Sequence, residues 1–111
     1  MKNTVRTLKQ RNSKLSPEDK DALDAEGQEI LARFAKNLKN SVSYKDEVNA
    51  DLLQEHFDWV KKFYSSNKVE YLAYAKNLAN DQSSIIALNQ IQEGLSGYIK
   101  SVAMFYIGKI R

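Results

Sequence analysis

The sequence contains no cysteine, one histidine and one proline in 111 residues. The absence of cysteine excludes disulfide scaffolds, thiolate metal sites and thiol nucleophiles, and it fits an intracellular protein. One histidine excludes a metal site that needs several imidazole ligands. No apolar run approaches the roughly 20 residues of a membrane-spanning helix, and the N-terminus lacks the apolar stretch of a signal peptide. The sequence therefore predicts a cytoplasmic protein with no metal, no cofactor and no membrane contact.

The length and charge distribution predict one domain preceded by a basic arm. A hydrophobic content of 42% and a charged content of 28% are typical of a folded globular chain. Residues 1–14 contain five cations and no acid, whereas residues 15–31 contain six acids and one lysine. Such an arm could hold phosphates or pack against the acidic helix, but it has no aromatic residue and no helix-turn-helix pattern. We interpret residues 1–14 as a solvated arm or linker remnant and residues 15–111 as the domain.

Apolar residues recur three and four positions apart through most of the chain, which is typical of amphipathic helices. Ser16 is a good N-cap and Pro17 suits the first position of a helix. The apolar stripe that follows predicts that this helix ends near Asn40. A second helix is predicted from about Asp46 to Tyr64.

The second half of the chain is also helical in its period. Asn67 and Glu70 predict a capped third helix that stops at residues 80–81. A long apolar stripe follows from Ser83, and Gly94 and Gly97 interrupt it. Glycine inside a helix costs about 1 kcal/mol relative to alanine, so these residues predict a bend or the close approach of another backbone. The chain is predicted to be an all-α single domain of four to five helices.

No catalytic site is assembled by these patterns. Hydrolytic and transfer chemistries need a nucleophile with a base, paired carboxylates in a cleft, or a metal. His56 could pair with Glu55 or Asp58, but neighbours in sequence diverge around a helix and cannot form a triad. EGLSGY lacks the spacing and the preceding strand of a nucleotide-binding loop. We expect that the protein is not an enzyme.

The aromatic residues are more informative than the charged ones. One tryptophan, six tyrosines and four phenylalanines all lie from Phe34 onward. Aromatic stripes usually form a packed core, but every buried tyrosine hydroxyl then needs a partner. A partly open cleft lined by tyrosine and tryptophan meets that demand, because the rings offer flat apolar faces while their polar ends stay hydrated or hydrogen-bonded. Both interpretations remain open at this point.

The order of several residues resembles a known family. The resemblance rests on Leu53, His56, Trp59, Phe63, Tyr64, Glu70, Tyr71, Ala79, Asp81, Glu93, Gly94, Leu95, Tyr98 and Ala103. In this order and spacing they resemble the TipAS antibiotic-recognition domain of MerR-type multidrug-sensing activators. LSPEDKDALDAEGQEIL is also similar to the opening helix of that domain, without the tryptophan that many members carry there. The resemblance covers essentially the whole chain.

The resemblance implies an all-helical, globin-like fold with a deep groove for amphipathic, ring-rich antibiotics such as thiopeptides, and no chemical turnover. Without cysteine, the covalent capture seen in part of the family is impossible. QSSIIALNQ lacks the aromatic residues that the family usually places after Asp81, so the pocket should differ in shape. The sequence contains no DNA-binding motif, so we expect DNA to be contacted only through a fused or separate helix-turn-helix domain.

We predict that Trp59 and Phe63 form one wall of this cleft and that Tyr71 and Tyr98 supply the opposite side. The full set of predicted ligand-binding residues is His56, Trp59, Phe63, Tyr64, Tyr71, Leu78, Tyr98 and Val102. The chain would then sense an antibiotic for a MerR-type regulator or sequester it alone. The alternative is a protein-interaction or homodimerisation module without a small ligand, built on the last helix with Tyr106, Ile107 and Ile110.

Overall fold

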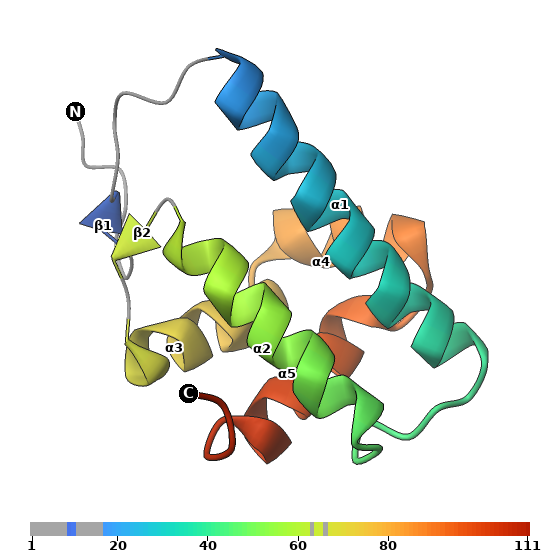
Figure 1. The fold of residues 1–111 in the computed structure, drawn as a ribbon. Helices are drawn as coiled ribbons and strands as arrows, with labels where there is room; N and C mark the ends of the chain where they lie inside the picture. Colours follow the sequence, from blue (N-terminus) through green and yellow to red (C-terminus); the bar gives the residue numbers. More distant parts are fainter. Residues whose placement is uncertain (1–8, 11–16, 63, 66) are drawn as a thin grey trace.

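The computed structural model describes residues 9–10, 17–62, 64–65 and 67–111. These residues form five helices and one pair of two-residue strands (Figure 1). The elements are β1 (Lys9–Gln10), α1 (Pro17–Lys39), α2 (Val48–Lys61), β2 (Tyr64–Ser65), α3 (Lys68–Leu78), α4 (Gln82–Ile91) and α5 (Leu95–Tyr106). The prediction of an all-α domain is confirmed. Within the described residues, no helix is both long enough and apolar enough to cross a membrane.

The last helix lies at the centre of the fold. α5 packs against α1, α2, α3 and α4, whereas α1 makes its most extensive contacts with α2. Figure 1 shows α1 crossing in front of α4, with α2 and α5 below it. Leu95, Ile99, Val102 and Ala103 on α5 are fully buried. Because successive turns of α5 face different neighbours, one helix joins the other four into a single core.

The local signals for helix ends predicted two helices well. α1 runs from Pro17 to Lys39, close to the predicted span, and the predicted cap Ser16 lies outside the described residues. At the start of α3, the Asn67 side chain accepts the backbone N–H of Glu70 at 2.9 Å, and the Glu70 side chain accepts the backbone N–H of Asn67 at 3.0 Å. This reciprocal pair satisfies two N–H groups that a helix start leaves unpaired.

The second helix is shorter at both ends than the sequence predicted. It begins at Val48, whose backbone N–H donates to Oδ1 of Asp46 at 3.0 Å, so Asp46 lies before the helix and not in it. It ends at Lys61, and Tyr64 belongs to β2, where it pairs with Gln10 in an antiparallel register. The prediction that Tyr64 is helical was wrong, because strand pairing between distant segments leaves no mark in a local helical period.

The long stripe after Ser83 is two helices, not one bent helix. Gly94 has a φ of 86° and occupies the N-cap position of α5, in the left-handed region that favours glycine. Asp81, predicted only as a stop for α3, also caps α4, because its side chain accepts the backbone N–H of Ser84 at 3.0 Å. The break between α4 and α5 lets the two helices pack against each other.

Candidate functional site

Trp59 of α2 contacts α1 at Leu23 and Gly27. Its indole Nε1 donates to the backbone carbonyl of Leu23 at 2.8 Å, and the side chain is half-buried. Beside it, a Cβ added to Gly27 would lie only 2.3 Å from Cζ2 of the indole. The ring can therefore lie flat against α1 only because residue 27 has no side chain.

This contact predicts opposite effects for the same substitution in two helices. Gly27→Ala forces the indole away from α1, and such overpacking typically costs about 1 to 3 kcal/mol. The gain in helix propensity is only about 1 kcal/mol, so we expect a net loss of up to about 2 kcal/mol. Gly97→Ala is the matched control, because an added Cβ there meets none of the described atoms within 4 Å. In urea unfolding at low protein concentration, the free energy of unfolding of Gly97→Ala should rise by about 1 kcal/mol. Equal stability of the two variants would contradict this packing.

His56 is the centre of an aromatic cluster that comprises Phe34, His56, Trp59, Tyr71 and Tyr74. Its ring stacks on Trp59 with centroids 5.7 Å apart and planes tilted by 16°. Its Nδ1 lies 2.6 Å from the hydroxyl of Tyr71, which is also fully buried. Edge contacts with Phe34 and a tilted contact with Tyr74 complete the surroundings.

Burial sets the charge state of this pair. Desolvation lowers the pKa of His56 to about 4, because the imidazolium would lose its hydration inside the core. Burial, with a smaller effect from Tyr74, raises the pKa of Tyr71 well above its usual value. Both groups are therefore neutral near pH 7. A buried tyrosine hydroxyl needs a hydrogen-bond partner, and the imidazole of His56 is that partner for Tyr71.

Tyr98 lies in a separate polar network. Its hydroxyl donates to the carbonyl of Val42 at 2.8 Å and accepts from Nδ2 of Asn49 at 2.8 Å. The same Nδ2 donates to the carbonyl of Ser43 at 3.0 Å, while Oδ1 of Asn49 accepts from Asn37 at 3.0 Å. Asn49 is fully buried, so these bonds fix the connector between α1 and α2 against α5.

The structure thus brings three of the predicted site residues, His56, Trp59 and Tyr71, into direct contact. Val102 is fully buried in α5, and Leu78 is half-buried at the end of α3. Phe63 lies outside the described residues, and Tyr64 is described only as part of β2. The predicted assignment of all eight residues to a ligand site remains a prediction.

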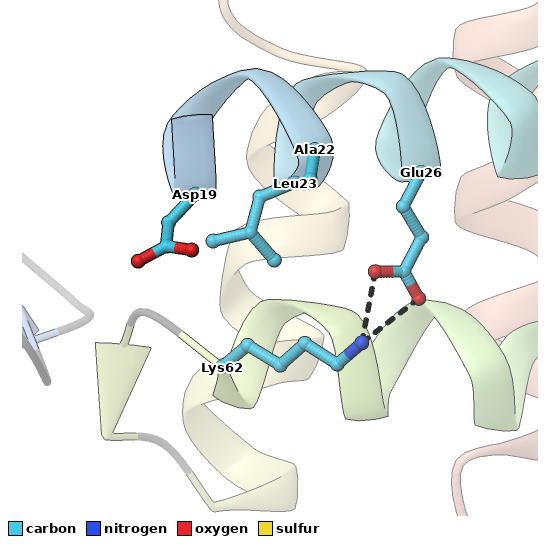
Figure 2. Close-up of a pocket in the computed structure, with 5 residues that line it drawn as sticks. All are labelled: Asp19, Ala22, Leu23, Glu26 and Lys62. Carbon is cyan, nitrogen blue, oxygen red and sulfur yellow. Dashed lines mark hydrogen bonds and ion pairs between the residues drawn. The ribbon is translucent and has the colours of Figure 1, made fainter. Parts of the chain in front are cut away.

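A surface hollow of about 340 Å³ lies between the first turns of α1 and the end of α2. Figure 2 shows Leu23 and Asp19 pointing from α1 toward the hollow, with Lys62 below them. Lys62 Nζ binds Oε1 and Oε2 of Glu26 at 2.8 and 3.1 Å across it. Its lining residues are Asp19, Ala22, Leu23, Glu26 and Lys62. Leu23 lines the hollow and its backbone carbonyl accepts the indole N–H, so Trp59, which is not itself a lining residue, contacts the wall of the hollow through Leu23.

The sequence did not predict this hollow. Its acidic residues were interpreted only as part of an acidic helix face, and Lys62 received no interpretation. Gly27 was the available signal, since a glycine inside an apolar helical stripe often marks the close approach of another group. Nothing in a single sequence showed that the approaching group is Trp59.

Comparison with known families decides the assignment. The family model described as the TipAS antibiotic-recognition domain matches residues 1–106. The chain belongs to the TipAS family. The match includes the basic arm of this TipAS domain as well as the part from α1 to α5. No curated protein and no solved structure gives a significant match.

The residues at the hollow of this TipAS domain combine charged and apolar groups. Within the described residues, no three histidine, cysteine or acidic side chains are grouped so that they could hold a metal. The charged groups at the hollow include one internal ion pair, and apolar lining is supplied by Ala22 and Leu23. Charged and apolar groups side by side suit an amphipathic molecule.

Proposed function

We propose that this TipAS domain binds an amphipathic, ring-rich, antibiotic-like molecule and does not transform it. The family supports the ligand class, and the observation that carries the proposal is the position of Trp59. Its indole is hydrogen-bonded to Leu23, which lines the hollow beneath α1, and it stacks on His56 in the aromatic cluster. In this proposal a ring of the guest packs on Leu23 and Trp59. A polar substituent of the guest takes the place of one partner in the ion pair between Glu26 and Lys62.

The size of the hollow limits how a guest enters. A volume of about 340 Å³ is near the lower end of the range for small-molecule pockets, about 300 to 1,000 Å³. A thiopeptide exceeds this space, so its binding requires the first turns of α1 to move away from Lys62. The solvent-exposed ion pair between Glu26 and Lys62 opposes this movement only weakly, because such pairs are typically worth less than about 1 kcal/mol.

The proposal keeps all eight predicted ligand-binding residues, in two roles. Trp59 and Leu78 are half-buried and can touch a guest directly. His56, Tyr71 and Val102 are buried, and they contribute by holding the wall in place or become accessible when α1 moves. Tyr98 is also buried. Phe63 and the side chain of Tyr64 lie outside the described part of the chain and stay in the proposed set on the strength of the sequence.

The cellular role proposed for the domain is that of a cytoplasmic effector module. Joined to a helix-turn-helix domain of the MerR type, the chain would convert antibiotic binding into transcriptional activation. Acting alone, it would lower the concentration of the drug by sequestration. DNA is contacted in the first case only, and through the helix-turn-helix domain.

The alternative function is a protein-interaction module, and the exposed rings at the end of α5 favour it. Tyr106 and Ile110 are buried within the chain, so the surface expected from the sequence is not available. Met104 and Phe105 are instead about half exposed, at 51% and 49%. A pure interaction module would respond to protein concentration and not to a small molecule.

Titration of the intrinsic fluorescence tests the proposal, because Trp59 is the only tryptophan. Adding a thiopeptide or another polycyclic antibiotic should change the intensity and wavelength of its emission, with matching heat in calorimetry. Dilution of the protein without antibiotic is the control. Lys62→Ala should weaken binding, whereas Lys100→Ala, which removes a lysine of α5 far along the sequence from the hollow, should not. Unchanged emission and no heat at high micromolar concentration would reject antibiotic binding.

A further inference from the structure

One face of α5 is an uncharged stripe that the described chain leaves open. Its members are spaced three and four residues apart, which places them on one side of the helix and its final turn. They are Gly97, Ser101, Met104, Phe105 and Gly108, of which Ser101 is half-buried and the others are exposed. A hollow of about 270 Å³ lies in this face, lined by Tyr44, Ser101, Met104 and Phe105. Large exposed apolar residues around a hollow are typical of an interaction surface.

Gly97 has no explanation inside the described chain. Gly94 is required by its positive φ, but Gly97 lies within α5 and is not among the glycines with positive φ. None of the described atoms lies within 4 Å of the position that its Cβ would occupy, so no neighbouring element requires a glycine there. Glycine inside a helix lowers stability relative to alanine. The position beside Gly97 therefore has room for a group from outside the described residues.

We propose that α5 of a second copy packs antiparallel against this face, around a twofold axis at Ser101. In such a pair, residues equally distant from Ser101 face each other across the interface. Four residues on either side are Gly97 and Phe105, so the exposed ring of each copy lies over the open glycine of the other. The face is self-complementary in shape, because its largest and smallest residues stand opposite each other.

The charges at the two ends of α5 fit the same register. Eight residues on either side of Ser101 are Glu93 and Lys109, both exposed and both in the turns that flank the helix. Antiparallel pairing brings the carboxylate of each copy toward the ammonium of the other. A parallel pair would instead place like charges together. Complementary charge at a rim fixes register more than it adds affinity.

This dimer goes beyond antibiotic binding and does not depend on it. The interface uses the outer face of α5, whereas the proposed guest site lies between α1 and α2. One helix from each copy forms a small contact, and interfaces below about 1,200 Å² are typical of weak and transient association. We expect reversible dimerisation at micromolar to millimolar protein concentration.

Sedimentation equilibrium over this range tests the proposal with a swap of large and small residues. Gly97→Phe and Phe105→Ala should each lower the association constant about tenfold or more, the first by steric clash and the second by loss of the ring. In the double variant, the ring at position 97 of one copy again faces a small side chain at position 105 of the other. Its association constant should therefore lie within about threefold of that of the native chain. Ile86→Ala, at a residue 51% exposed on α4, is the matched control and should change nothing.

Charge reversal provides a second check of the register. Glu93→Lys and Lys109→Glu should each weaken the dimer, and the two together should restore it. Circular dichroism verifies that each variant is folded. A chain that stays monomeric at every concentration, or a dimer that ignores these substitutions or is not recovered in the double variants, would overturn the proposal. The tryptophan titration tests antibiotic binding independently of the dimer, so either proposal can fail without the other.

Discussion

Acidification from pH 7 to pH 5 is expected to lower the free energy of unfolding by about 2 kcal/mol through His56 alone. Its pKa is about 4 in the folded protein, against an ordinary value of 6.5, because burial disfavours the charged imidazole. Between these two values the unfolded chain binds more protons than the folded one, so stability falls as the pH falls. The contribution is fully present above pH 6.5 and lost progressively down to pH 4, where the loss reaches about 3 kcal/mol.

Urea unfolding at a series of pH values measures this slope. His56→Gln is the matched variant, since it keeps a polar side chain of some bulk beside the hydroxyl of Tyr71 but cannot titrate. The chain has no second histidine, so the stability of this variant should change little between pH 7 and pH 5. An equal slope in both proteins would show that His56 is not the group that takes up the proton.

Trp59→Ala should lower the free energy of unfolding by about 3 kcal/mol, near the lower end of the usual range for losing a large buried ring. The substitution removes the stack on His56, the hydrogen bond to Leu23 and the ring that covers Gly27. The cost is at the lower end because the indole is only half-buried. Antibiotic affinity should fall at least about tenfold, because the ring belongs to the proposed site and holds the Leu23 wall in place.

Two further variants separate these contributions. Trp59→Phe keeps an aromatic ring but loses the N–H donor, which should cost about 1 kcal/mol. Val69→Ala, at a position 77% exposed on α3, should leave both stability and binding unchanged. Unfolding is followed by circular dichroism, because Trp59→Ala and Trp59→Phe both lack the single tryptophan. If Trp59→Ala binds a thiopeptide as tightly as the native chain, the guest site is not beside this ring.

The features that the sequence predicted well are those encoded over a few neighbouring residues. The capping pair of Asn67 and Glu70 spans three positions, and the apolar period of α1 repeats every turn. The pairing of Lys9 with Ser65 joins segments 56 positions apart, and no local pattern specifies it. Gly94 was recognised as an interruption, but only the structure shows that α4 has already ended at Ile91 and that Gly94 caps the start of α5.

The candidate site was predictable to a similar degree. Trp59 follows His56 by three residues on one helix, so their contact follows from helical geometry. The partner of Tyr98 is the amide of Asn49, 49 positions away, which the sequence offered no reason to choose. The contact of Trp59 with Gly27 depends on how α1 lies across α2, and that is set by packing of the whole core.

The central position of α5 has a consequence for how the protein is made. α5 joins α1, α2, α3 and α4, yet it is the last of the five helices to be synthesised. Until Leu95 to Tyr106 has left the ribosome, the apolar faces of the four earlier helices have no common surface to cover them. The nascent chain therefore depends on chaperones or on rapid completion to avoid aggregation. A chain truncated before α5 would lack the helix that contacts all four others, so we expect it not to form a stable core.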